Sequence, residues 1–277
     1  FDRHAIPNID YAYSNACLYD SILFTNNSTV DLPSVFQTYD WDFGDGNTSN
    51  SNSPYHTYAN HGTYTTKLVG TTQFGCQDSL EQDITIYPTP AAQFSFTNDC
   101  YNVLANFTDQ SSLASGSITN WLWNFGDGLT GNLDNESHLY SLDGNFQVEL
   151  VVTSDNNCTD TVTHTITRFP LPVPAYTANS ECVYDQVQFN DNSSINAPDN
   201  ITNWEWSFGP GLNSTQTSPS ILFPTAGSNP VKLVLTSNNG CKDSIISTID
   251  IYAQPNANFI TNDDCNNIPA TYIDNSS

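Results

Sequence analysis

Aspartates beside glycines form the stretch of this sequence that is best suited to bind a ligand. Residues 41–46 read Trp-Asp-Phe-Gly-Asp-Gly, and related stretches return at 123–128 and 206–211. Calcium takes about six to eight oxygen ligands, and carboxylates converging from one loop are typical donors. Asp42, Asp45 and Asp127 are therefore the candidate metal ligands of this chain.

The differences between the three copies indicate what the stretch does. Asp42 becomes Asn124 and then Ser207, and the second aspartate of the stretch becomes Pro210 in the third copy. Each of these changes removes a carboxylate that a calcium site would need. We therefore expect the stretch to fold without a cofactor, and calcium bound by the aspartates is the alternative.

One Trp, one Phe and two Gly persist in all three copies. A Trp and a Phe that lie two residues apart on a strand point to the same face, and glycines permit the positive φ of a tight hairpin. We interpret the stretch as a core strand entering a turn, in which Asp45 and Asp127 accept hydrogen bonds from backbone N–H groups. The predicted core residues are Trp41, Phe43, Trp123, Phe125, Trp206 and Phe208.

The histidines do not form a recurring catalytic pattern. His56 and His138 are equivalent, but the third copy has Ile221 at that position, which favours a packing role. The histidines without a His equivalent are His4, His61 and His164. No Ser-His-Asp order recurs, no Cys-x-x-Cys occurs, and no glycine loop precedes a helical pattern. The sequence therefore predicts a protein that is not an enzyme.

The charge balance is strongly acidic. The 277 residues include 29 acidic and 5 basic side chains, which give a formal net charge of −24. This field repels nucleic acid and anionic membranes, so we expect neither as a partner. No apolar run reaches the roughly 18 residues that a membrane span needs, so we expect no membrane insertion in this segment. Aromatic residues make up 12%, which is more than a disordered acidic chain would carry.

Internal repeats determine most of the expected architecture. The stretch "PNIDYAYSNAC" at Pro7 returns in related form at Pro90, Pro172 and Pro255, in steps of 90−7 = 83, 172−90 = 82 and 255−172 = 83 residues. Met is absent, even at position 1, and we interpret the chain as a window of a longer tandem array. The predicted divisions are the end of a preceding repeat at 1–6, three repeats at 7–89, 90–171 and 172–254, and the start of a fourth at 255–277.

Each repeat contains short strands separated by turn residues. Alternation is clearest at Phe146, Val148, Leu150 and Val152, where a period of two indicates a half-buried strand. Trp121 and Trp204 share a face with the recurring Trp by parity, so we expect them in the core as well. No segment has a helical period. About seven strands in ~80 residues predict an all-β fold, an antiparallel sandwich in each repeat.

The combined motifs resemble the polycystic kidney disease (PKD) repeat. In the first copy these are the Trp-x-Phe-Gly-Asp-Gly element, "PYHTY" at 54–58 and "GTYTTKLV" at 62–69. The third copy departs from the pattern at Pro210 and in "SILFP" at 220–224. The resemblance covers all three full repeats and implies tandem immunoglobulin-like sandwiches in a linear string. The repeats look most like those of large cell-surface and gliding-associated adhesins of Bacteroidota, which implies extracellular spacing or adhesion.

Seven cysteines occupy two equivalent positions of the repeats. Cys17, Cys100, Cys182 and Cys265 precede the second expected strand, and Cys76, Cys158 and Cys241 follow the sixth. Regular placement without metal-ligand spacing indicates disulfides, and therefore an extracellular or cell-surface location.

Two sets of disulfides are compatible with this placement. Pairing within repeats would give Cys17–Cys76, Cys100–Cys158 and Cys182–Cys241. In an immunoglobulin-like sandwich, however, the first turn and the last turn lie at opposite ends, about 20 Å apart, whereas a disulfide needs Cα atoms within about 7 Å. A head-to-tail string instead brings Cys17 toward Cys158 and Cys100 toward Cys241. We predict this second set, with the first as the alternative and with Cys76, Cys182 and Cys265 paired outside the window.

Modification sites are a further expectation. Ser79, Thr161 and Ser244 occur at equivalent positions within Asp-Ser/Thr-apolar triplets, which resemble O-glycan acceptor sites of Bacteroidota. The alternative is a strand that begins with polar residues. Asn106 and Asn192 lie in Asn-x-Ser/Thr sequons, which occur by chance in a chain so rich in Asn and Ser.

These observations predict a non-catalytic structural or adhesive stalk, or filament shaft, of a large extracellular bacterial surface protein. Its partners would be the neighbouring repeats of the same chain, with other surface proteins or glycans as further candidates. The alternative is a carbohydrate- or calcium-binding accessory array of a secreted hydrolase. An exposed aromatic platform would favour that alternative, but the recurring Trp lies on the predicted core face.

Overall fold

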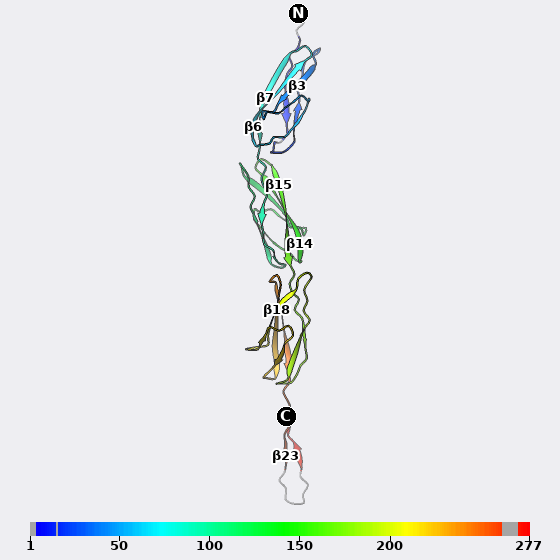
Figure 1. Cartoon of the computed structure of the whole chain (residues 1–277), viewed down its shortest axis with the longest axis vertical. Helices are drawn as coiled ribbons and strands as arrows, with labels where there is room; N and C mark the ends of the chain where they lie inside the picture. The colour runs from blue at the N-terminus through cyan, green and yellow to red at the C-terminus, as the bar shows by residue number, and fades with distance from the viewer. Residues whose placement is uncertain (1–3, 15, 262–270) are drawn as a thin grey trace, which may run out of the picture. The chain divides into compact units, whose positions relative to one another are not determined.

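A computed structural model describes residues 4–14, 16–261 and 271–277 of the chain. These residues form strands and turns, as the sequence predicts, and the sheets follow one another along the chain (Figure 1). Across the described residues there is no helix long and apolar enough to cross a membrane.

The first repeat is a sandwich of two antiparallel sheets. One sheet has the order β1-β2-β5 and the other the order β4-β3-β6-β7. Figure 1 marks β3, β6 and β7 of the second sheet. The strands are β1 (Tyr11–Tyr13), β2 (Ile22–Asn26), β3 (Phe36–Asp42), β4 (Thr48–Ser49), β5 (Tyr55–His56), β6 (Gly62–Thr72) and β7 (Gln77–Ile86).

The second repeat has the same plan with one additional short strand, which pairs in parallel with the last strand. Its sheets have the orders β13-β10-β8 and β12-β11-β14-β15-β9. The strands are β8 (Phe94–Ser95), β9 (Asp99–Cys100), β10 (Leu104–Asp109), β11 (Ile118–Asn124), β12 (Thr130–Gly131), β13 (Glu136–Leu139), β14 (Gly144–Ser154) and β15 (Thr159–Phe169).

The third repeat returns to the plan of the first, with sheets β16-β17-β20 and β19-β18-β21-β22. A two-stranded sheet, β23-β24, follows it. The strands are β16 (Tyr176–Ala178), β17 (Gln186–Asp191), β18 (Ile201–Ser207), β19 (Asn213–Ser214), β20 (Ser220–Leu222), β21 (Gly227–Ser237), β22 (Lys242–Ile251), β23 (Phe259–Thr261) and β24 (Tyr272–Asp274).

The chain divides into two compact units, and the division falls within the second repeat. The first unit comprises residues 1–96, 106–138 and 146–165, and the second comprises 97–105, 139–145 and 166–277.

A buried Trp occupies the centre of each repeat. Trp41, Trp123 and Trp206 are at most 2% exposed, and the Phe two residues later is at most 3% exposed in every copy. An aromatic ring from the first strand of each repeat meets the Trp edge-on, with ring centroids 5.0, 5.0 and 5.2 Å apart. Such pairs add to the free energy that burial of the rings contributes. The Trp-x-Phe pattern therefore forms the core that the sequence predicts.

Trp121 and Trp204 differ from the expectation of a fully buried core. Both share the inward face but are only half-buried. Each indole N–H donates to a carboxylate at 2.8 Å, to Asp109 Oδ2 and Asp191 Oδ2 respectively. These rings lie at the margin of the sandwich, because an indole N–H placed deeper would lose a polar partner that it needs when buried.

The first glycine of the Trp-x-Phe-Gly stretch is required in the first two repeats, where two backbones approach closely. Gly44 has φ +77° and Gly126 has φ +81°. A Cβ at Gly44 would lie 2.4 Å from the Thr65 carbonyl oxygen, and one at Gly126 would lie 2.5 Å from that of Gln147. Glycine therefore permits both the left-handed turn and the contact with the neighbouring strand.

Gly126→Ala should destabilise the second repeat by at least about 2 kcal/mol, since it adds a backbone collision to left-handed strain. Gly128→Ala is the matched control: Gly128 also has positive φ (+94°), but nothing lies within 4 Å of its Cβ position. We expect that control to cost about 1 kcal/mol. Urea unfolding followed by the indole N–H signals of the full chain measures both, and equal losses would contradict the role of the close approach.

Candidate functional site: the Asp turn and the bridges between repeats

The aspartates of the turn bind the backbone, as predicted. Asp45 Oδ1 accepts the Asn47 N–H at 3.0 Å, and Asp127 Oδ1 accepts the Leu129 N–H at 3.1 Å. Asp42 Oδ1 likewise accepts the Gly44 N–H at 2.9 Å. These are local side-chain to backbone bonds of the Asx type, which hold tight turns.

The second oxygen of each turn aspartate bonds to a histidine. His56 Nε2 lies 2.8 Å from Asp45 Oδ2, and His138 Nε2 lies 2.6 Å from Asp127 Oδ2. The four side chains are between 10% and 19% exposed. Each imidazole also stacks on the core Phe of its repeat, with centroids 4.1 and 4.2 Å apart. The histidines therefore pack, as the sequence suggested, and in addition they fasten the turn to the opposite sheet.

Comparison of the repeats contained a signal for the Asp–His contact that the sequence analysis did not use. In the third repeat Asp and His are lost together, to Pro210 and Ile221. Two positions that change together in this way indicate a contact. Among residues 4–14, 16–261 and 271–277, no group of three or more His, Cys, Asp or Glu side chains is arranged to hold a metal ion.

The bonds at Asp45 favour its ionised form. Partial burial raises the pKa of the carboxyl, but the Asn47 N–H, the His56 ring and the Asn47 side chain outweigh burial and hold that pKa below its usual value. A carboxyl whose pKa is lower in the folded than in the unfolded state stabilises the fold at pH values above its unfolded pKa of about 4. This contribution to stability disappears as the pH falls through the pKa of the folded state.

Asp45→Asn should therefore lower the stability of the first repeat at neutral pH, and the difference from wild type should vanish well below pH ~4. The measurement is urea unfolding of the full chain at a series of pH values, followed by the Trp41 indole N–H signal. The Trp206 signal is the internal control, because its repeat has Pro210 in place of the aspartate. A difference that persisted undiminished at pH 2 would contradict the assignment.

Two disulfides join cysteines of consecutive repeats. Cys17 is bonded to Cys158 with Cα atoms 5.7 Å apart, and Cys100 is bonded to Cys241 with Cα atoms 5.6 Å apart. Both pairs are 141 residues apart in the sequence. These are the pairs that the head-to-tail argument selects, and the pairing within repeats is not formed.

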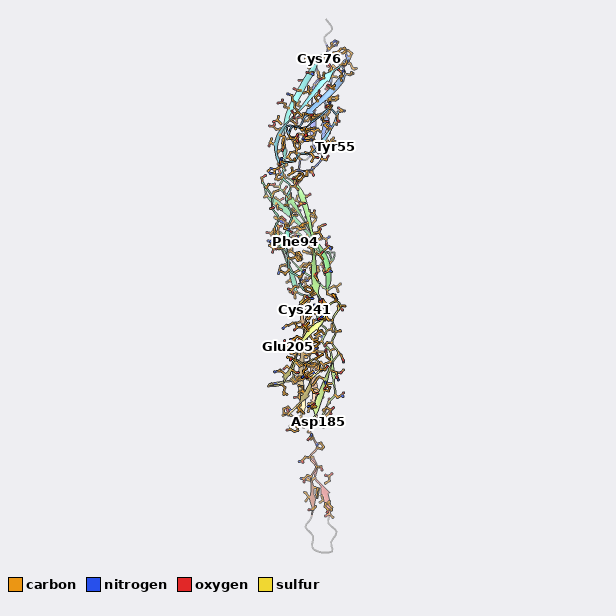
Figure 2. The ribbon with its side chains drawn as sticks, in the orientation of Figure 1. Tyr55, Cys76, Phe94, Asp185, Glu205 and Cys241 are labelled. Atoms are coloured by element: carbon orange, nitrogen blue, oxygen red, sulfur yellow. A yellow bond between two sulfur atoms is a disulfide. The ribbon has the colours of Figure 1, made fainter. Side chains whose placement is uncertain are left out.

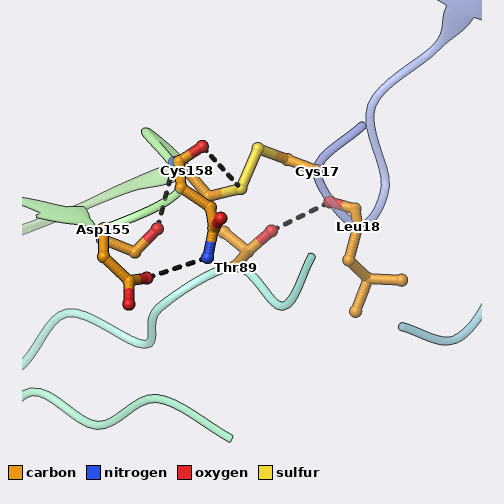
Figure 3. Close-up of a disulfide and its surroundings, with 7 residues drawn as sticks. Cys17, Leu18, Thr89, Asp155 and Cys158 are labelled. Carbon is orange, nitrogen blue, oxygen red and sulfur yellow. Dashed lines mark hydrogen bonds between the residues drawn. A yellow bond between two sulfur atoms is a disulfide. The ribbon is translucent and has the colours of Figure 1, made fainter. Parts of the chain in front are cut away.

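The turn at Cys17 also meets the linker that follows the first repeat. Thr89 Oγ1 donates to the Leu18 carbonyl at 2.9 Å, beside the Cys17–Cys158 bridge (Figure 3). Leu18 N–H donates to the Tyr87 carbonyl at 2.8 Å, just before that linker. The first-turn cysteine therefore lies on a backbone that is held at two further points.

The hairpins that carry the last-turn cysteines share one construction. Cys158 N–H donates to Ser154 Oγ and Cys241 N–H donates to Ser237 Oγ, each at 3.1 Å. Cys76, which lies in the same hairpin of the first repeat (Figure 2), donates to Thr72 Oγ1 at 3.2 Å. The hydroxyl holds the cysteine backbone in the same way at the free Cys76 and at the two bridged cysteines.

Cys76 and Cys182 are free thiols in this structure, and both are partly exposed. The prediction that they pair with cysteines outside the chain stays a prediction. Cys265 lies outside the described residues.

A buried arginine supports the Cys100 turn, and the sequence analysis did not identify it. Arg168 is 1% exposed and its Nη2 donates to the carbonyl oxygens of Cys100, at 2.7 Å, and Val103. Its guanidinium lies over the Tyr140 ring, 5.6 Å from the centroid. Burial lowers the pKa of Arg168, and nearby Asp99 opposes this. The equivalent residues of the other repeats are isoleucines, so the only available signal was a cation at an apolar position.

The candidate O-glycan acceptors are exposed on β7, β15 and β22, the last long strand of each repeat along the chain. Ser79, Thr161 and Ser244 all lie on the solvent side. The preceding aspartate accepts the N–H of Ser79 and of Ser244, at 2.8 and 2.7 Å. Accessibility is compatible with either the acceptor or the strand-start interpretation, and modification at these residues stays a prediction.

Fold and bridges define this chain as tandem immunoglobulin-like sandwiches joined by disulfides. A family model, the PKD domain, matches residues 4–87, 88–169 and 170–252. The chain therefore belongs to the PKD domain family.

Relatives of this chain include bacterial proteases. The chain is 27% identical over 157 residues to the pre-pro-metalloprotease PrtV of Vibrio cholerae, which covers 56% of this chain and 17% of that protein. It is 37% identical over 59 residues to the microbial collagenase of Vibrio alginolyticus, which covers 21% of this chain and 7% of the collagenase. A crystal structure of the PKD1 domain of PrtV is 30% identical and covers 29% of this chain and 96% of that domain, with a TM-score of 0.27. The matched segments are thus small parts of the named proteases.

Proposed function

We propose that this chain is the disulfide-locked accessory region of a longer extracellular protein, in which it spaces and presents a hydrolase domain. The relatives named above carry PKD sequence as a minor part of a protease, which supports this reading over a free-standing role. Disulfides persist in oxidising compartments, so they support a location outside the cytosol.

The observation that carries the proposal is the placement of the bridges. Both join consecutive repeats and neither closes a loop within one repeat. A domain that needed a disulfide only for its own stability would gain it from a bridge within the repeat. A bridge across a joint restricts the movement of one repeat against the next, which is the property that a spacer needs.

A surface stalk, the shaft of an adhesin, is the second candidate function. Cys76 is a last-turn cysteine and Cys182 is a first-turn cysteine, and both are free. Because a bridge joins a first-turn cysteine of one repeat to a last-turn cysteine of the next, these two favour further bridges of the same kind to additional repeats. The resemblance to gliding-associated adhesins of Bacteroidota finds no support among the relatives. The residues that flank this chain in its parent protein distinguish the two candidates: a hydrolase domain supports the accessory region, and more repeats of 82–83 residues support the stalk.

Small-angle X-ray scattering tests the spacing role directly. The oxidised chain should give a sharply bounded distribution of interatomic distances, and reduction of the bridges should broaden it. Cys76→Ser/Cys182→Ser is the control that leaves both bridges intact. Identical scattering before and after reduction would show that the bridges do not restrict the joints, and would overturn the proposal.

A further inference from the structure

Two equivalent grooves lie on the outer faces of the larger sheets of the first and third repeats. Their volumes are about 280 and 470 Å³. The groove of the first repeat is lined by Asp40, Trp41, Asp42, residues 48–50, Lys67 and Val69. The groove of the third repeat is lined by Glu205, Trp206, Ser207, residues 213–215, Lys232 and Val234.

The wall of each groove is fixed by the buried core Trp. Trp41 Nε1–H donates to the Ser51 carbonyl at 3.0 Å, and Trp206 Nε1–H donates to the Gln216 carbonyl at 2.9 Å. These carbonyls follow directly after the segments that form the walls, 48–50 and 213–215. The wall is therefore anchored to the core, and the site is preformed.

Strand register places the same chemistry in both grooves. Asp40 pairs with Val69 across β3 and β6, and Glu205 pairs with Val234 across β18 and β21. Two residues further along the same face, Lys67 pairs with Asp42 and Lys232 pairs with Ser207.

Each groove thus offers a carboxylate, an ammonium group and a floor of valine, and the groove of the first repeat adds a second carboxylate, that of Asp42. Its wall adds short hydroxyl and amide side chains, which are Thr48, Ser49 and Asn50 in the first repeat and Asn213, Ser214 and Thr215 in the third.

This combination fits a neutral saccharide better than other ligands. Sugar hydroxyls both donate and accept, so they can satisfy a carboxylate, an ammonium group and hydroxyls together. The valine floor suits the C–H face of a sugar ring. The net charge of −24 disfavours anions, and the size is at or near the lower end of the usual range for small-ligand pockets, about 300–1,000 Å³.

The second repeat lacks this chemistry at the same positions. Leu122 replaces the carboxylate and Glu149 replaces the lysine. Gly131 replaces the wall serine, and the Glu136 carboxylate lies against it, where it accepts the N–H groups of Asn132 and Leu133 at 2.8 and 2.9 Å. The chain therefore contains its own control repeat.

We propose that the grooves of the first and third repeats bind a neutral saccharide, about one or two sugar rings each. Glu205 and Lys232 are the specificity-determining side chains of the third repeat, and Asp40 and Lys67 are those of the first. Lys67 also pairs with Glu81 at 2.9 Å, which leaves the first groove with less free positive charge than the third. None of these residues takes part in a disulfide, so the proposal does not depend on the spacing role.

The test is a titration of the full 277-residue chain with maltohexaose, cellohexaose and chitohexaose in turn, monitored by the NMR chemical shifts of the backbone amides. At least one of them should cause saturable shifts at residues 205–207, 213–215 and 232–234, with the equivalent shifts in the first repeat. Residues 122–124 and 149–151 of the second repeat should not shift. Absence of saturable shifts with all three saccharides overturns the proposal, as does a site that binds an arginine-rich peptide and no saccharide.

Variants separate this site from a general charge effect. Lys232→Glu, which introduces the residue of the second repeat, should weaken binding at the third repeat at least tenfold and leave the first repeat unchanged. Lys242→Glu makes the same charge change on β22 of the same sheet, outside the groove. It should change affinity less than twofold. Equal losses in the two variants would show that net charge, and not the groove, determines binding.

Discussion

Trp123→Ala should destabilise the second repeat by about 3–5 kcal/mol, the usual cost of removing a large aromatic from a core. Trp123 is completely buried and contacts Phe94 and Phe107, with ring centroids 5.0 and 5.7 Å apart. Its indole N–H also donates to the Leu133 carbonyl at 2.9 Å, so the substitution leaves that acceptor unpaired. A domain of this size has a total stability of about 5–15 kcal/mol, so the repeat should become marginal.

Urea unfolding of the full chain measures this loss repeat by repeat. The Trp121 indole N–H signal reports on the second repeat, and the signals of Trp41 and Trp206 report on its neighbours. Leu122→Ala is the matched control, since Leu122 lies on the same strand with 50% of its surface exposed. It should cost less than about 0.5 kcal/mol. A loss below 1 kcal/mol for Trp123→Ala would mean that the strand does not present Trp123 to the core.

Removal of the Cys17–Cys158 bridge should have the other large effect. The bridge joins residues 141 apart, and in the chain-entropy account a loop of that length restricts the unfolded state by about 5 kcal/mol. Cys17→Ser/Cys158→Ser should therefore lower the free energy of unfolding of the first two repeats by up to this amount. Cys76→Ser removes a cysteine that is free in this structure and should change stability by less than about 0.5 kcal/mol.

Peptide mapping under non-reducing conditions checks the connectivity on which that effect depends. We expect cross-links between the peptides of Cys17 and Cys158 and between those of Cys100 and Cys241. A Cys100–Cys158 cross-link would contradict the arrangement of the bridges. It would also remove the main support for the spacing role, because such a bridge closes within a single repeat.

The repeat architecture could be predicted from the sequence because the physical signal is local. Alternation at Val148, Leu150 and Val152 marks one face of a strand, and all three side chains are fully buried. The recurring Trp-x-Phe pair has the same cause, since residues two apart on a strand point the same way. Because the sequence repeats every 82–83 residues, a strand or core residue predicted in one repeat is also predicted at the equivalent positions of the others.

The polar contacts of the site could be predicted only in part. Bonds from Asp45 to the turn backbone are local, and turn chemistry predicts them. The bond from Asp45 to His56 crosses between two sheets, so it depends on how the sheets pack. Arg168 shows the same limit: its partners, Cys100 and Val103, are remote in sequence and meet it only in the folded repeat.

Sequence alone determined the fold class, the repeat period, the core aromatics and the two positions at which cysteines occur. These properties follow from periodicity, from turn residues and from comparison of the copies with one another. The tertiary structure decided which groups meet across those elements: Asp45 with His56, the Trp121 indole N–H with Asp109, and the wall of each groove with its buried Trp. Such contacts depend on strand order and register, which are set by the packing of a whole sandwich, and no short stretch of residues specifies them.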